Sequence, residues 1–88
     1  MMHLKEAFQE AKNRIESHQV EPSNEELLQL YAYFKQATIG NNMVEEPSNL
    51  DFKAIAKFRA WKKLEGMDSE SAMSRYIDLV NAIIEKKS

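Results

Sequence analysis

The chain has 88 residues, a formal net charge of −2 and no cysteine. This length supports one small domain over residues 1–88, and the missing cysteines exclude a disulfide framework, a thiolate metal site and a cysteine nucleophile. The slightly acidic balance excludes a strong overall attraction to nucleic acid or to an anionic membrane, so any phosphate site has to be local.

The first predicted element is a helix over residues 3–17. Its apolar residues Leu4, Phe8, Ala11 and Ile15 are spaced by four, three and four positions. This spacing places them on one stripe of an amphipathic helix. The first residues of the chain include several charges, and the sequence has no run of ~18 apolar residues. We therefore predict no cleaved signal and no stable membrane insertion. We expect a cytoplasmic protein.

The second predicted helix covers residues 25–38. Ser23 and Glu26 have the spacing of a capping box, with Asn24 as an alternative cap. Gly40 suits the left-handed geometry that ends many helices. The apolar side of this helix is expected to be buried and comprises Leu27, Leu30, Phe34 and Ala37.

A loop of about ten residues, 39–49, separates this helix from a third one over residues 51–64, which ends before Gly66. The loop is long for a helix connection, and loops of this length in compact domains are often functional. We therefore expect it to border a binding site.

The fourth predicted helix begins at Asp68 or Ser69. Its apolar stripe consists of Met73, Tyr76 or Ile77, Val80, and Ile83 or Ile84. Four amphipathic helices and no strand predict an all-α fold, a bundle of four helices, although periodicity does not give the order in which they pack.

Tyr31 and Lys35 are four residues apart on the second helix, so a phenol and an ammonium group share one helix face and can converge on an anion. Lys53, Lys57 and Trp61 repeat this spacing on the third helix. Together they suggest a ligand that carries phosphate and a ring. On spacing alone, a half-buried tyrosine, solvated lysines and a core tryptophan are the simpler interpretation.

Catalysis has no visible machinery in this sequence. His3 and His18 belong to no HExxH or other metal-binding motif, and the adjacent acidic pairs at 25–26 and 45–46 do not form an acid/base dyad. No nucleophile elbow or glycine-rich phosphate loop is present. We expect no enzymatic activity, no catalytic residue, no metal site and no cofactor.

Three runs carry a resemblance to a known family: YxxFKQATIGN at 31–41, LDFKAIAKFRAWKKLEG at 50–66 and SAMSRYIDLV at 71–80. They resemble the acyl-CoA-binding protein family, whose signature is Tyr-x-x-Tyr-Lys-Gln-Ala-Thr-x-Gly-Asp. The resemblance extends from Phe8 to about Val80. It implies an up-down four-helix bundle of that type and a monomeric carrier whose partner is a medium- to long-chain acyl-CoA ester.

The resemblance also implies the site residues. Tyr31, Lys35 and Lys57 would hold phosphate of the 3'-phospho-ADP part of coenzyme A, and Lys53 would reach the same region. Tyr76 would contact the adenine ring. Leu27 and Leu28 match apolar positions that line the site, and Phe34 replaces the second tyrosine of the signature while keeping an aromatic ring there.

The chain departs from the family pattern at several positions. Glu16 stands where the family commonly has a lysine that helps to hold the nucleotide, and Lys12 lies one turn earlier. Phe58 replaces a usual tryptophan, and Asn41 replaces the aspartate after the glycine. Glu16 and Phe34 keep a rival hypothesis open, a helical protein-interaction module on the same fold with weakened ligand binding. An acyl-CoA-processing enzyme is a further rival, which the missing nucleophile and base disfavour.

Overall fold

The computed structural model describes residues 3–48 and 51–87 of the chain. Within these residues it contains helices and no strand, as predicted, and their bounds differ from the predicted ones by at most two positions. The helices are α1 (Leu4–Ser17), α2 (Asn24–Thr38), α3 (Phe52–Lys62) and α4 (Ser69–Lys87).

The ends of the helices follow from local hydrogen bonds. The capping box is confirmed, because the Glu26 backbone N–H donates to the Ser23 hydroxyl over 3.1 Å and the Ser23 N–H donates to the Glu26 carboxylate over 2.7 Å. At the start of α3, the Asp51 side chain accepts from the Ala54 N–H over 3.1 Å. Gly40 and Gly66 take positive φ angles of 98° and 94° after α2 and α3, a backbone conformation that glycine adopts without strain.

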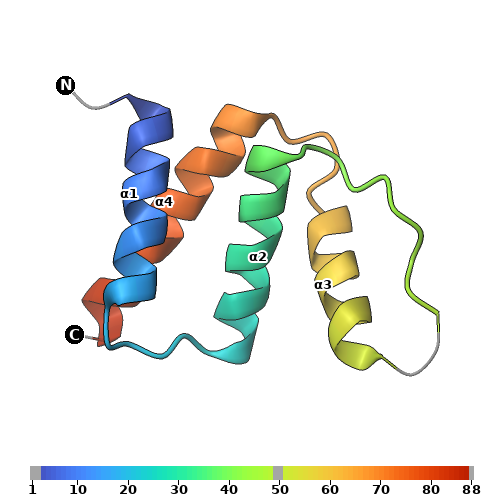
Figure 1. Cartoon of the computed structure of the whole chain (residues 1–88), viewed down its shortest axis with the longest axis horizontal. Helices are drawn as coiled ribbons and strands as arrows, with labels where there is room; N and C mark the ends of the chain where they lie inside the picture. The colour runs from blue at the N-terminus through green and yellow to red at the C-terminus, as the bar shows by residue number, and fades with distance from the viewer. Residues whose placement is uncertain (1–2, 49–50, 88) are drawn as a thin grey trace.

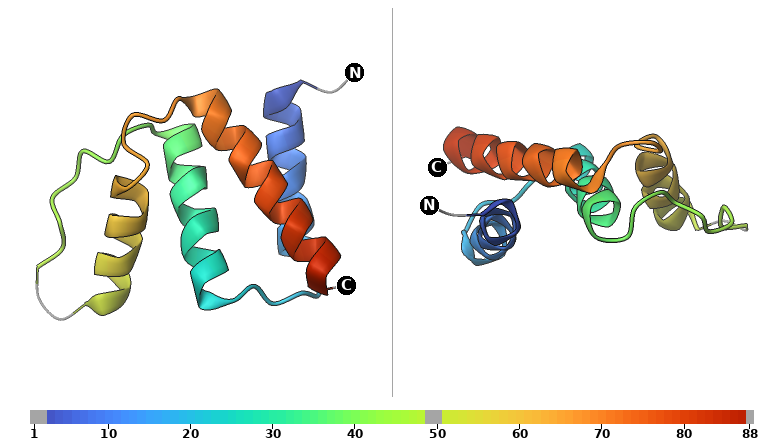
Figure 2. Two further views of the ribbon diagram at one scale, coloured as in Figure 1. Left: turned by 180° about the vertical axis from the view of Figure 1, so that it is seen from behind. Right: turned by 90° about the horizontal axis from the view of Figure 1, so that it is seen from above.

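The helices pack in the spatial order α1, α4, α2, α3 (Figure 1). Helices α1 and α4 run in one direction and α2 and α3 in the other, and the long loop after α2 carries the chain back to begin α3. The molecule measures 43 × 26 × 16 Å along its principal axes. Figure 2 shows α1 and α4 stacked at one end of this slab and α3 at the other, beyond α2. Within the described residues, α3 packs against α2 and no other helix.

The core lies where α4 packs between α1 and α2, and it decides the alternatives that periodicity left open on α4. Tyr76 and Ile83 are buried, whereas Ile77 and Ile84 are only partly buried. The prediction that Leu27 is buried is wrong, because 50% of its surface is exposed. It lies in the first turns of α2, beyond the reach of α4, and faces a pocket instead of the core. The core residues are Phe8, Ala11, Leu30, Ala37, Ala72, Met73, Tyr76, Val80 and Ile83.

Residues 3–48 and 51–87 contain no helix that is both long and apolar enough to cross a membrane. No three acidic, histidine or cysteine side chains in this part of the chain are grouped so that they could hold a metal ion.

Candidate functional site

A pocket of about 580 Å³ lies between the first turns of α2 and of α3. Because the two helices run in parallel, the N-terminal half of each faces the same space. The walls are mainly apolar, with two lysines at the rim. The lining residues are Asn24, Leu27, Leu28, Tyr31, Phe52, Lys53, Ala56 and Lys57.

A second, smaller pocket of about 200 Å³ continues from the first, with which it shares Tyr31 and Lys57. Val44 and Pro47 of the long loop form part of its wall, so the loop borders this pocket, and that the pocket belongs to a binding site stays a prediction. The remaining lining residues are Asn42, Ala54, Phe58 and Trp61.

Two ammonium groups converge on the ring of Tyr31. The Nζ atom of Lys35 lies 5.7 Å from the Tyr31 ring centroid, and the Nζ atom of Lys57 lies 5.4 Å from it. Lys35 is also 5.7 Å from the Trp61 ring, so two aromatic rings flank its charge. Such contacts with ring faces are favourable but weak at exposed sites, on the order of 0.5–1 kcal/mol.

The lysines near this pocket have no carboxylate partner among the described residues. None of the ion pairs formed within the described part of the chain includes Lys35, Lys53 or Lys57. Two like charges beside one phenol repel each other, and an anion placed between them would remove that repulsion. We call Tyr31, Lys35 and Lys57, with the Trp61 ring, the anion site.

A second cluster joins α2 to α1 and α4. The rings of Phe8, Phe34 and Tyr76 pack with centroid separations of 5.0 to 6.1 Å. The Lys12 ammonium group lies 5.3 Å from the Phe34 ring centroid and 3.5 Å from the Glu16 carboxylate. We call these five residues the aromatic corner.

Tyr76 is a core residue of this corner, with 4% of its surface exposed. Its burial, and to a lesser extent the nearby Glu16 carboxylate, raise the pKa of the Tyr76 phenol to about 12. The hydroxyl is therefore neutral throughout the physiological range.

The structure thus divides the residues singled out in the sequence into two groups. Leu27, Leu28, Tyr31, Lys53 and Lys57 line one pocket, and Lys35 lies beside them against the Tyr31 ring. Phe34 and Tyr76 belong to the aromatic corner and do not line that pocket.

Sequence reasoning missed Phe52, which lines the pocket and is 72% exposed. A large apolar residue directly before Lys53, at the start of a helix, was the available signal. It also missed the role of Gln36, which is fully buried and accepts a hydrogen bond from Trp61 over 3.2 Å.

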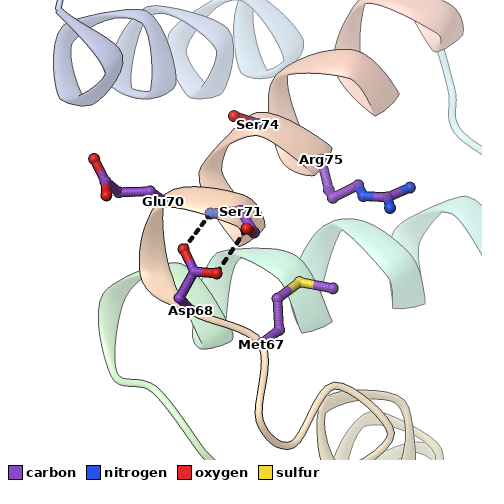
Figure 3. A pocket seen from close by; sticks show the side chains of 6 residues that line it. All are labelled: Met67, Asp68, Glu70, Ser71, Ser74 and Arg75. Carbon is purple, nitrogen blue, oxygen red and sulfur yellow. Dashed lines mark hydrogen bonds between the residues drawn. The ribbon is translucent and has the colours of Figure 1, made fainter.

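The chain has a further open pocket of about 650 Å³ at the start of α4 (Figure 3). Its wall combines Asp68, Glu70 and Arg75 with two serines and Met67. The Asp68 carboxylate accepts hydrogen bonds from the Ser71 hydroxyl over 2.7 Å and from the Ser71 backbone N–H over 2.9 Å. These hydrogen bonds lower the pKa of Asp68. None of the site residues predicted from the sequence lines this pocket.

Comparison with known proteins gives a consistent result. The family model described as "Acyl CoA binding protein" matches residues 5–80. The acyl-CoA-binding protein homolog of Drosophila melanogaster is 42% identical over 83 residues, which cover 94% of this chain and 96% of that protein.

Solved structures agree with the sequence match. The crystal structure of Oryza sativa acyl-CoA-binding protein 2 superposes with a TM-score of 0.89 at 36% identity, over 96% of this chain and 93% of that one. The crystal structure of ACBP from Moniliophthora perniciosa gives a TM-score of 0.89 at 35% identity, over 97% of this chain and 83% of that one. The predicted fold class and family resemblance are therefore confirmed.

Proposed function

The chain belongs to the acyl-CoA-binding protein family, and on this premise we propose that it is a monomeric intracellular carrier of medium- to long-chain acyl-CoA esters. Proteins of this family bind their ligand and are not enzymes. The observation that carries the proposal is the anion site, in which two lysines converge on Tyr31 at the rim of an apolar pocket and have no carboxylate partner among the described residues.

The anion site is suited to the 3'-phospho-ADP head of coenzyme A. The Tyr31 hydroxyl and the Lys35 and Lys57 ammonium groups are all hydrogen-bond donors, and charge-assisted bonds to phosphate are the stronger kind. Lys53, one turn before Lys57 on α3, extends the positive charge along the pocket rim.

The aromatic corner supplies the other wall of the proposed site. Lys12 lies over the Phe34 ring, which packs against Tyr76, and it adds a cation toward α1. Tyr76 is too deeply buried to offer a stacking face, so we propose that adenine meets its edge or the neighbouring Phe34 ring.

The apolar pocket is suited to the acyl chain. Leu27 and Phe52 are 50% and 72% exposed, so a bound hydrocarbon would cover apolar surface that the chain itself leaves in contact with water. Each methylene moved out of water contributes about 0.8 kcal/mol, and this is also why a free acyl-CoA ester enters membranes and micelles unless a protein shields it.

The rival hypothesis, an interaction module with weakened ligand binding, rests on Glu16 and Phe34, and Glu16 is the stronger argument because it is charged. Its carboxylate lies in the aromatic corner and would repel phosphate there. However, Lys12 pairs with Glu16 over 3.5 Å and offsets its charge.

Isothermal titration with palmitoyl-CoA below its micelle concentration tests the proposal, with coenzyme A and palmitate titrated separately. We expect one site for the ester and a much lower affinity for either fragment, because only the ester occupies both the anion site and the apolar pocket. If none of the three ligands binds, the carrier hypothesis is wrong and the interaction module becomes the better interpretation.

A further inference from the structure

A buried hydrogen-bond network joins the end of α2 to the end of α3. Gln36 is 0% exposed and uses both ends of its amide group. Its Nε2 donates to the Asn41 side chain over 2.9 Å and to the Met67 carbonyl over 2.8 Å. Its Oε1 accepts from the Trp61 indole N–H, which also donates to the Gly40 carbonyl over 2.8 Å.

Asn41 extends this network into the loop, and Asn42 makes a separate set of bonds between the loop and α3. The Asn41 side-chain oxygen accepts a second bond, from the Gly66 N–H over 2.8 Å. Asn42, also 0% exposed, donates to the Phe58 carbonyl over 3.1 Å and accepts from the Val44 N–H. We call the bonds that involve Gln36 or its partners the Gln36 network. A buried network of this kind with its partners satisfied holds its members in one arrangement.

The network matters for α3 because, besides its packing on α2, this helix is held mainly by contacts with the long loop, such as Arg59 with Glu46 and Lys62 with the Asn42 carbonyl. Helix α3 packs against α2 alone among the described helices, and it lies at the edge of the molecule. The anion site spans both helices, with Tyr31 and Lys35 on α2 and Lys57 on α3. The separation of the two ammonium groups therefore depends on how firmly α3 is fixed to α2.

A continuous series of contacts links Gln36 to the ammonium groups. The Gln36 amide and the Gly40 carbonyl together orient the Trp61 indole, and the Trp61 ring lies 5.7 Å from the Lys35 Nζ atom. Lys35 in turn contacts the Tyr31 ring, which Lys57 also contacts. Gln36 itself is buried away from solvent and cannot touch a ligand.

We propose that Gln36 is a positioning residue for the anion site, which it preorganises through Trp61 and through the attachment of α3 to α2. This inference rests on the proposed function for its consequence on binding, but the positioning itself concerns the protein alone. Binding sites lose affinity when the residues that hold their contact groups are loosened.

The test compares Gln36→Met, which keeps the side-chain length and removes the hydrogen bonds, with Ile83→Ala as a matched control. Ile83 is 1% exposed and belongs to the core around α4, so its truncation destabilises the protein without touching the network. Asn41→Ala is a milder second variant at an exposed position, where one partner of Gln36 is lost.

The first readout needs no ligand. In the wild-type protein, NMR should show the Lys35 side-chain protons shifted upfield by the ring currents of Tyr31 and Trp61. We expect Gln36→Met to move these signals toward ordinary lysine values and Asn41→Ala to move them partway, whereas Ile83→Ala should leave them in place.

The second readout is affinity for coenzyme A, which we expect to fall roughly three- to thirtyfold in Gln36→Met and less than twofold in Ile83→Ala. Unchanged Lys35 signals in both network variants, unchanged affinity in Gln36→Met, or equal losses in Ile83→Ala would overturn the inference. If the wild-type protein binds neither coenzyme A nor palmitoyl-CoA, the proposed function fails, and the Lys35 signals alone decide whether Gln36 positions the ammonium group.

Discussion

Replacement of Lys35 by alanine should separate ligand binding from folding stability. In the free protein the Lys35 ammonium group has two aromatic neighbours and a second cation, Lys57, near the same ring. Removing this group loses contacts with aromatic rings that contribute about 0.5–1 kcal/mol, and it also removes the charge repulsion between Lys35 and Lys57. We therefore expect the free energy of unfolding to change by less than about 0.5 kcal/mol, as for many surface substitutions.

The loss in binding should be much larger. A hydrogen bond to a charged group contributes about 1.5–3 kcal/mol, so Lys35→Ala should weaken binding of coenzyme A by roughly 10- to 150-fold. Isothermal titration at two salt concentrations measures this loss. The loss should shrink as salt rises, because part of it is electrostatic.

Lys5→Ala is the matched control for this prediction. Lys5 is exposed on α1 and the substitution changes the net charge by the same amount. Its effect on affinity should stay below about twofold. If Lys35→Ala binds as tightly as the wild-type protein, the anion site is misassigned. If both variants weaken binding equally, the overall charge of the protein and not a local contact governs affinity.

Three further predictions follow from the local geometry. Glu16→Lys should tighten coenzyme A binding, because it replaces a carboxylate in the aromatic corner by a cation; unchanged or weaker binding in the titration would mean that this corner does not meet the head group. Ser23→Ala removes the bond to the Glu26 N–H and should cost about 1 kcal/mol, or roughly 4–8 °C in the melting temperature, with coenzyme A affinity unchanged. An unchanged melting temperature would show that the cap adds nothing to stability. The raised pKa of Tyr76, about 12 against 10 for an ordinary tyrosine, favours the neutral phenol in the folded state, so its contribution is complete below about pH 10 and is lost as the pH rises toward 12. Urea unfolding at pH 9 and 11.5 should show that the free energy of unfolding falls more between these two pH values in the wild-type protein than in Tyr76→Phe. An equal fall in both proteins would contradict the argument that burial raises the pKa of Tyr76.

Local chemistry made the helix ends predictable. The capping box at Ser23 and the left-handed glycines at 40 and 66 depend on neighbouring residues only, so the sequence contains all the information they need. The spacing of Tyr31 and Lys35 likewise guaranteed a shared face once α2 formed. The contact with Lys57 needed the parallel packing of α2 and α3, which periodicity does not specify.

Exposure was harder to predict than helix position. Leu27 has the spacing of a core residue, yet α2 and α3 leave an open pocket between their first turns, and Leu27 lines this pocket. A helical stripe shows which residues share a face but not how far the neighbouring helix extends along it. The Gln36 network was beyond sequence reasoning for a similar reason, since it joins residues up to 31 positions apart.

The two departures that raised the rival hypothesis both fall in the aromatic corner. Glu16 and Phe34 lie there, and Lys12 already pairs with Glu16, so the local charge of that corner is close to zero. The anion site between α2 and α3 keeps two cations that form no ion pair with a carboxylate of the described residues. Because charged hydrogen bonds contribute more than neutral contacts, most of the affinity for a phosphorylated head should come from the α2–α3 side. We therefore expect Glu16 and Phe34 to change the position of the bound nucleotide more than whether it binds.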